Sequence, residues 1–181
     1  MELLRAKLAA CALALILAVV PAGSAAHVDA TEYGLKSVFL YQFCRFMEWP
    51  ASAFSSPRDP LVIGVIGDDP FGQLLNEAVE GETYHGRPIR IEHYRNPRDI
   101  KRCHILFVSH SDEDQVNQIL SSVAGKNIIT VGETDDFLDH GGMIALTADR
   151  NKVHVRVNQS SLRTANVEVS SKLLRVAEIR G

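Results

Sequence analysis

Three short, mostly apolar runs are the feature that most constrains what this chain can fold into. They cover residues 61–66, 103–108 and 127–131, and the first is apolar throughout. A short run of this kind is typical of a strand buried on both faces of a parallel sheet. Helical apolar spacing follows the first run over 70–79 and the second over 112–123. Because parallel strands need crossover connections, this alternation predicts an α/β fold.

The rest of the chain adds edge elements to that frame. A strand with one wetter face is predicted over 87–94, and two strands over 142–148 and 152–157 form a hairpin. Closing helices are expected over 159–165 and 171–179. The predicted architecture is a three-layer α/β sandwich, with a mainly parallel sheet, a C-terminal hairpin and helices on both faces.

The N-terminus has the pattern of a secretory signal. Arg5 and Lys7 precede an apolar run over 8–20, Pro21 breaks that run, and small residues follow over 24–26. Thirteen apolar residues are too few to span a bilayer comfortably. We therefore expect a cleaved signal peptide over residues 1–26 and a single α/β domain over 27–181, with an uncleaved membrane anchor as the alternative.

Charge excludes one class of partner. The 181 residues carry 19 basic and 22 acidic side chains, a formal charge of −3. A nucleic-acid-binding protein needs a basic face and a high isoelectric point. No nucleic acid partner is therefore expected.

Export leaves two cysteines, Cys44 and Cys103, in an oxidising compartment. An intramolecular disulfide would close a loop of about 60 residues and stabilise the fold by roughly 4 kcal/mol. It requires Cα atoms within about 7 Å, between a predicted helix and a predicted strand. Two buried free thiols are favoured, and a disulfide or an intermolecular link are the alternatives.

The first predicted helix, over 31–49, is apolar around most of its circumference and ends before Pro50. A helix packed on one side of a core needs an apolar stripe of only about 100°. One interpretation is a helix buried on both sides. The other is that its surplus surface meets a partner or a second copy of the chain, because exposed aromatic patches are typical of binding sites. The candidate interface residues are Phe39, Tyr41, Phe46 and Trp49.

The turn after the first strand contains Asp68 and Asp69, followed by Pro70. Ligands of such folds bind at the carboxyl ends of strands, but the glycine spacing here fits neither a Rossmann motif nor a P-loop. The simplest interpretation is a helix N-cap at Asp68. The alternative is a small cationic or amine ligand held by the two carboxylates.

No catalytic motif is present. No two of the seven histidines lie three or four residues apart, and HExxH, Cys-x-x-Cys and Gly-x-Ser-x-Gly are absent. Asp135 and Asp136 follow Thr134 and are predicted to begin a helix. We expect no metal, no cofactor and no enzymatic activity.

Several motifs, taken in their order and spacing, resemble the YfiR family of exported proteins. They are residues 39–43, 48–50, 63–72, 86–89, 103–107, 141–144 and 170–174. The resemblance implies a periplasmic, non-enzymatic regulator that binds the periplasmic domain of an inner-membrane diguanylate cyclase and represses it. Such repression lowers cyclic-di-GMP and disfavours biofilm.

The resemblance also implies sequestration by an OmpA-like outer-membrane lipoprotein, and a homodimer. Well-studied members carry extra cysteines and two disulfides. This chain departs from them, because no cysteine lies between residues 45 and 102 or after 103. A periplasmic small-molecule binding module, with its ligand near Asp68 and Asp69, is the alternative function.

Overall fold

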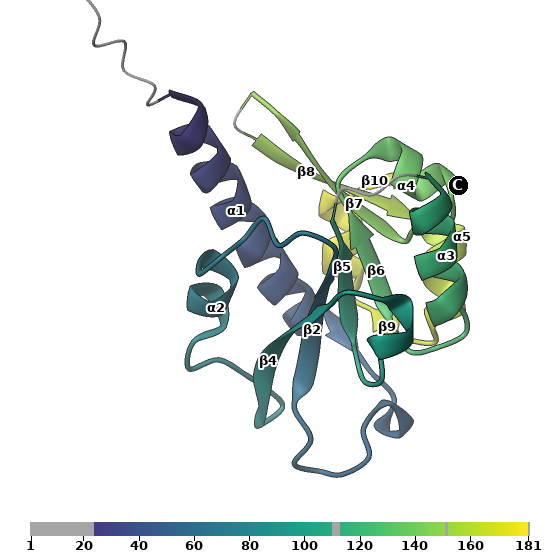
Figure 1. Cartoon of the computed structure of the whole chain (residues 1–181). Coiled ribbons are helices and arrows are strands. Elements are labelled where there is room, and N and C mark those ends of the chain that lie inside the picture. Colours follow the sequence, from purple (N-terminus) through teal and green to yellow (C-terminus); the bar gives the residue numbers. More distant parts are fainter. Residues whose placement is uncertain (1–23, 110–112, 151, 181) are drawn as a thin grey trace, which may run out of the picture.

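The computed structural model describes residues 24–109, 113–150 and 152–180 (Figure 1). The expected signal peptide therefore lies almost wholly outside the described residues, and so do residues 110–112, which include the first residue of the helix predicted over 112–123. The centre of the structure is an eight-stranded sheet with the order β10-β8-β7-β6-β5-β2-β4-β3. Its strands are β2 (Leu61–Ile66), β3 (Thr83–Tyr84), β4 (Arg87–Tyr94), β5 (Ile105–Val108), β6 (Ile129–Gly132), β7 (Ile144–Asp149), β8 (Lys152–Asn158) and β10 (Glu178–Arg180).

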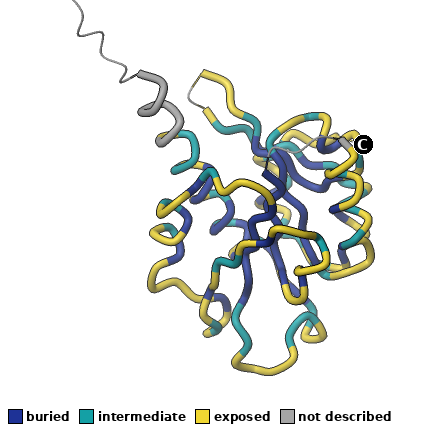
Figure 2. Tube along the Cα trace, in the orientation of Figure 1, coloured by how far each residue is buried: buried dark blue, intermediate teal, exposed yellow. Residues whose placement is uncertain are grey.

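The sheet is mainly parallel, as predicted. β4, β2, β5, β6 and β7 run parallel to one another in that order. The predicted hairpin is confirmed, because β7 and β8 pair antiparallel with Ile144 opposite Val157. All residues of β2, β5 and β6 are buried, which explains why their sequences are apolar apart from Thr130. Figure 2 shows these strands as the buried centre of the molecule.

Helices cover both faces of the sheet, which confirms the predicted fold class. One core contains Ile105 and Phe107 of β5, and the other contains Leu106 and Val108, because successive strand residues point to opposite faces. The first face is covered by α1 (Ser24–Phe46), α2 (Leu74–Val79), α5 (Gln159–Leu162) and α6 (Ser171–Val176). The second face is covered by α3 (Glu113–Val123) and α4 (Asp135–Asp139).

Helix α1 ends earlier than predicted. Its last residue is Phe46, and Met47–Glu48 form β1, which pairs antiparallel with β9 (Glu168–Val169). The amide of Ser170 donates to the carbonyl of Phe46 at 2.8 Å, so the end of α1 is bound to the segment that precedes α6. The chain then passes Pro50 into a 3-10 turn, η1 (Ala51–Ala53). Short-range apolar periodicity could not reveal this pairing, because β9 lies far along the chain.

The C-terminal prediction of one helix over 171–179 is wrong. Helix α6 ends at Val176, and the chain continues as the edge strand β10, parallel to β8. Val176, the last residue of α6, is 73% exposed. Two other 3-10 turns, η2 (Pro97–Asp99) and η3 (Arg163–Ala165), complete the fold.

Candidate partner-binding surface

The four predicted interface residues, three on α1 and one just after β1, fall into two groups. Tyr41 and Trp49 are buried within the chain itself, whereas Phe39 and Phe46 are half-buried against the same core. The large apolar side chains that α1 exposes are others, Leu35 at 39% and Val38 at 48%. They are three residues apart and therefore share one helix face. The candidate interface predicted from the sequence included neither of them, because it rested on aromatic side chains.

Trp49 is held by intramolecular contacts. Its indole Nε1 donates to the carbonyl of Asn127 at 3.0 Å, and its backbone N–H donates to the hydroxyl of Tyr84 at 3.1 Å. Its ring meets those of Tyr84 and His104 edge-on, at centroid distances of 5.6 and 5.9 Å. Buried indoles normally find such a partner for their N–H. Trp49 therefore contributes to the core of the single chain.

Tyr41 also has a hydrogen-bond partner within the chain. Its hydroxyl donates to the Glu82 carboxylate at 2.5 Å, between α1 and the segment that follows α2. This hydrogen bond and burial raise the pKa of Tyr41. Of the four aromatic residues predicted for the interface, Phe39 and Phe46 remain the ones with substantial accessible surface.

A buried lysine holds the N-terminal half of α1 on the sheet. Lys36 is 2% exposed, and its Nζ lies 2.5 Å from carboxylate oxygens of both Glu32 and Glu133. The same ammonium lies 4.8 Å from the ring centroid of Tyr33, a cation–π contact. Glu133 follows β6 directly, so Lys36 joins α1 to the carboxyl edge of the sheet. The sequence places Lys36 four residues after Glu32 and beside apolar positions of the helix, but the prediction did not single it out.

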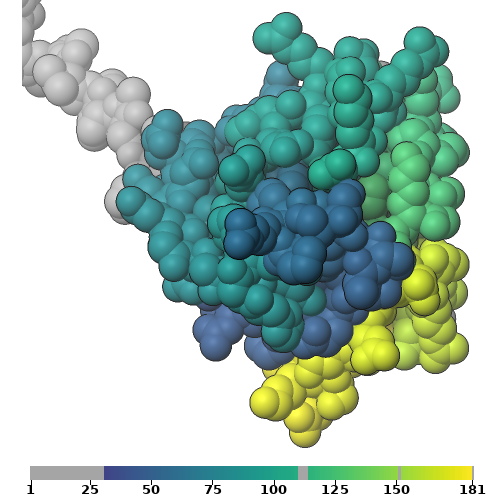
Figure 3. All heavy atoms as spheres, turned by 90° about the horizontal axis from the view of Figure 1, so that it is seen from below, coloured from purple at the N-terminus to yellow at the C-terminus, as the bar shows by residue number. Residues whose placement is uncertain are grey.

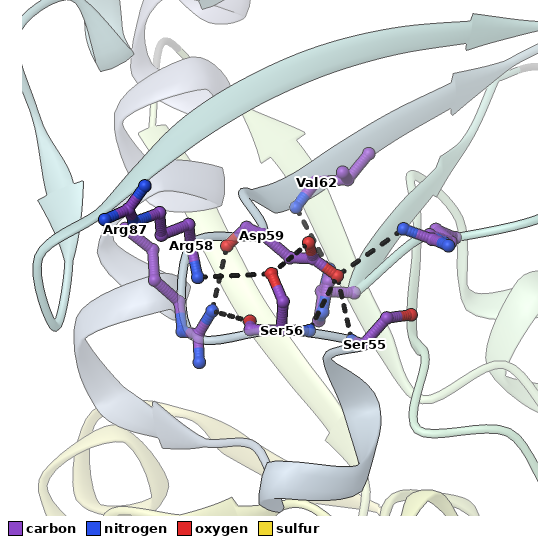
Figure 4. A network of polar contacts seen from close by, with 8 residues as sticks. Ser55, Ser56, Arg58, Asp59, Val62 and Arg87 are labelled. Atoms are coloured by element: carbon purple, nitrogen blue, oxygen red, sulfur yellow. Dashed lines mark hydrogen bonds and ion pairs between the residues drawn. The ribbon is translucent and has the colours of Figure 1, made fainter.

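The loop between η1 and β2 is organised by Asp59 (Figure 4). Its carboxylate accepts hydrogen bonds from the amides of Ser55 and Ser56 and from the Ser56 hydroxyl, the last at 2.7 Å. The Ser56 hydroxyl bond, with the two amides, lowers the pKa of Asp59. Arg87 donates to the carbonyls of Ser56 and Asp59, and its guanidinium lies 4.0 Å from the ring centroid of Phe54. These contacts are all internal to the loop and its neighbours.

His104 lies behind this loop. It stacks on Phe54 with a centroid distance of 4.5 Å, and its Nδ1 accepts a hydrogen bond from the Val62 amide at 3.0 Å. That bond assigns the proton of the neutral ring to Nε2, which is buried and has no hydrogen-bond partner of normal geometry among the described residues. Burial lowers the pKa of His104 to about 4, against a smaller opposing effect of the Ala53 backbone.

The disulfide considered between Cys44 and Cys103 is not formed. Both thiols are free and buried, as favoured from sequence, and they belong to the cores on opposite faces of the sheet. Burial raises the pKa of each thiol to about 12, so neither carries thiolate character at neutral pH. Cys103 also fills the space beside Gly64, where a Cβ atom would lie 2.9 Å from its sulfur.

Asp68 and Asp69 do not begin a helix. Helix α2 starts at Leu74, so the predicted N-cap at Asp68 is wrong. Asp69 instead accepts from the amide of Phe71 at 2.9 Å and pairs with Nε2 of His93 at 3.0 Å. Asp68 is exposed. Because Asp69 already has two internal partners, the structure offers no added support for a small-ligand turn here.

Two hollows lie elsewhere on the surface. One, of about 580 Å³, has Glu77, Glu80 and Glu82 in its lining, and the other, of about 560 Å³, lies beside Trp49 and Arg163. Neither includes Asp68 or Asp69. Within the described residues no group of three or more histidine, cysteine, aspartate or glutamate side chains could hold a metal ion. No helix in the described part of the chain is long and apolar enough to cross a membrane.

The fold is a three-layer α/β sandwich, and its most prominent candidate site is the partly exposed apolar face of α1, which is suited to binding a partner. The chain belongs to the YfiR/HmsC-like family, which it matches over residues 33–178. Members of this family are periplasmic regulators of diguanylate cyclase signalling rather than enzymes. A membrane diguanylate cyclase is the kind of partner that the family implies.

Solved structures similar to this chain are distant. A conserved domain protein from Vibrio cholerae O1 biovar El Tor strain N16961 is 9% identical, with a TM-score of 0.49, over 66% of this chain and 54% of that one. An ABC domain from Streptococcus pneumonia, in complex with L-Trp, is 9% identical, with a TM-score of 0.48, over 66% and 55%. The chain thus spans about half the length of these structures. No curated protein matches it.

Proposed function

We propose that this protein binds the periplasmic domain of an inner-membrane diguanylate cyclase and holds the cyclase inactive, through the outward face of α1. That face consists of Leu35 and Val38, with the accessible parts of Phe39 and Phe46. The observation that carries the proposal is the exposure of two aliphatic side chains, 39% and 48%, on a helix that otherwise supplies the core. Family membership supplies the class of partner.

The position of α1 supports this assignment. Lys36 lies between Leu35 and Val38 in the sequence, but its side chain is on the inner side of the helix, where it forms an ion pair with Glu133. The outer face is therefore held at a set angle to the sheet. Pre-ordered side chains lose less conformational entropy on binding than mobile ones, so a rigid apolar face is suited to a protein partner.

The test is Leu35→Glu combined with Val38→Glu, measured by binding to the isolated periplasmic cyclase domain. We expect at least a tenfold loss of affinity, because two carboxylates would be desolvated against an apolar partner. Val176→Glu is the matched control, since Val176 is also an exposed aliphatic residue but lies on α6. Retained binding by the α1 variant, or loss only in the Val176 variant, would contradict the assignment to α1.

In cells, deletion of the gene should raise cyclic-di-GMP and favour biofilm, and the α1 variant should behave like the deletion. An OmpA-like outer-membrane lipoprotein that sequesters the protein would also release the cyclase and raise cyclic-di-GMP. A homodimer through the same face would compete with the cyclase. Sedimentation of the wild type and of the α1 variant separates these two uses of the helix, because a dimer through α1 would dissociate in the variant.

A further inference from the structure

The second half of β4 and the connection from β4 to β5 carry a local excess of positive charge in an acidic protein. Residues 90–102 contain five cationic and two carboxylate side chains, a local charge of +3 in a chain of −3. The cations are Arg90, Arg95, Arg98, Lys101 and Arg102, and all five are exposed. We call this set the basic crossover.

These five side chains are presented on one side of the sheet. Ile89 and Ile91 belong to the core under α1, so Arg90 between them points to the opposite face. The connection after β4 crosses that same face, where η2 packs against α3 (Figure 1). The basic crossover therefore lies on the face of the sheet opposite α1.

The backbone that carries these cations is held in place. The hydroxyl of Tyr94 donates to the carbonyl of Arg102 at 3.1 Å. Ile100 and Cys103 are buried in the core beneath α3. The connection is thus fastened at both ends and in the middle, while its cations extend into solvent.

Most of this charge is not neutralised internally. Among the described residues, Arg102 pairs with Asp59 at 3.4 Å, but Arg90, Arg95, Arg98 and Lys101 have no ion-pair partner. In the view of Figure 3, the teal part of the chain that includes this connection contributes protruding side chains to the surface. Four unpaired cations on a fixed backbone form a persistent positive field rather than a set of internal salt bridges.

The composition of the surface indicates its partner. The large apolar residues that the structure exposes are on α1, α6 and β10, so the basic crossover lacks the apolar centre of a typical protein interface. A basic protein surface without an exposed apolar side chain fits an anionic membrane surface. It can contact the lipid headgroups electrostatically without inserting into the bilayer. We propose that the basic crossover binds the anionic phospholipid surface of the membrane in which the cyclase resides. The α1 face remains free for the cyclase, because it lies on the other side of the sheet.

The expected effect follows from the charge count. Neutralising three cations near an anionic bilayer weakens membrane partitioning on the order of 100-fold. The attraction should also fall steeply with salt, since the Debye length shortens to about 8 Å at physiological ionic strength.

The experiment measures co-sedimentation of the protein, purified from the periplasm, with vesicles at low ionic strength. One set of vesicles contains phosphatidylglycerol and the other only phosphatidylcholine. The test variant is Arg95→Gln, Arg98→Gln and Lys101→Gln. The matched control is Arg163→Gln, Lys172→Gln and Arg175→Gln, which removes three exposed cations from the C-terminal elements and gives the same net charge.

The proposal predicts binding to phosphatidylglycerol vesicles alone, lost in the test variant and retained in the control. Absence of wild-type binding, equal binding to phosphatidylcholine, or equal loss in both variants would overturn it. If the test variant instead loses binding to the isolated cyclase domain, the basic crossover serves an acidic protein and the lipid assignment is wrong. Cyclase binding without lipid is measured separately, so failure here leaves the proposed function intact.

Discussion

At the scale of single residues, the most consequential groups are polar side chains enclosed by the core. Lys36 joins α1 to the carboxyl edge of the sheet, and His104 accepts a backbone hydrogen bond beneath the η1 loop. A buried charge that loses its partner destabilises a fold strongly, and a buried neutral histidine makes stability depend on pH. Each of these two residues therefore gives a quantitative prediction.

Replacing Lys36 by methionine should lower the free energy of unfolding by about 3 kcal/mol, because Glu133 would lose its buried partner. The double variant Lys36→Met with Glu133→Gln should recover most of that loss, since it removes the second charge as well. Urea unfolding of both variants measures the effect. A double variant no more stable than the single one would show that the ion pair does not account for the role of Lys36.

Acidification should destabilise the protein through His104. Its pKa is about 4 in the folded chain, against 6.5 for an unperturbed histidine, so the unfolded state binds one proton more between those values. The contribution of His104 to the free energy of unfolding is therefore fully present above pH 6.5. It is lost as the pH falls toward 4, by roughly 3 kcal/mol in total.

The comparison is with His104→Asn, whose side-chain oxygen can replace Nδ1 as the acceptor for the Val62 amide but does not titrate. Thermal unfolding across this pH range should show a shallower pH dependence for the variant. An equally steep dependence in both proteins would assign the effect to other groups.

At the scale of elements, the edge strand β10 depends on charge more than on apolar contact. Arg156 of β8 pairs with Asp135 of α4 and with Glu178 of β10, and Arg180 lies 3.3 Å from Asp135. The Arg156 hydrogen bond lowers the pKa of Asp135. All three residues of β10 are exposed, so this network ties the strand to the body of the fold.

Asp135→Asn should loosen β10 without unfolding the domain. Exposed ion pairs contribute at most about 1 kcal/mol each, so the global loss of stability should be small. Amide exchange over residues 178–180 should nevertheless increase clearly, because the anchor at α4 is weakened. Asp139→Asn is the control, since its contact with Arg180 is longer, at 3.6 Å. Equal exchange in both variants would contradict a central role for Asp135.

At the scale of the whole molecule, the predicted signal peptide and the two buried thiols can be tested together. We expect the protein recovered from the periplasm to begin at His27, after cleavage of residues 1–26. Intact-mass measurement tests this, and a full-length chain retained in the membrane fraction would support the anchor alternative. Alkylation in the same experiment should modify Cys44 and Cys103 only after unfolding, with no prior reduction. A redox switch through a disulfide between them is therefore not expected.

The sequence by itself determined the architecture. Short, mostly apolar runs and alternating helical spacing are local signals, and they predicted the parallel strands, the hairpin and the two-sided helix cover. The helix start after Thr134 was also predicted, and α4 does begin at Asp135, with the Thr134 hydroxyl accepting from the Phe137 amide. Motifs spread over the chain resembled the right family. Such features depend on neighbouring residues or on their order, both of which a sequence displays.

Only the tertiary structure decided which side of α1 is exposed and what its residues touch. Trp49 meets Asn127 and Lys36 meets Glu133 across long sequence separations, and β10 pairs with β8 after a helix that ends early. The apolar residues of the helix predicted over 31–49 cover most of its circumference, so their spacing could not separate Leu35 and Val38 from Tyr41 and Trp49. Exposure depends on which distant segments pack against a residue, and that information arises only when the chain is folded.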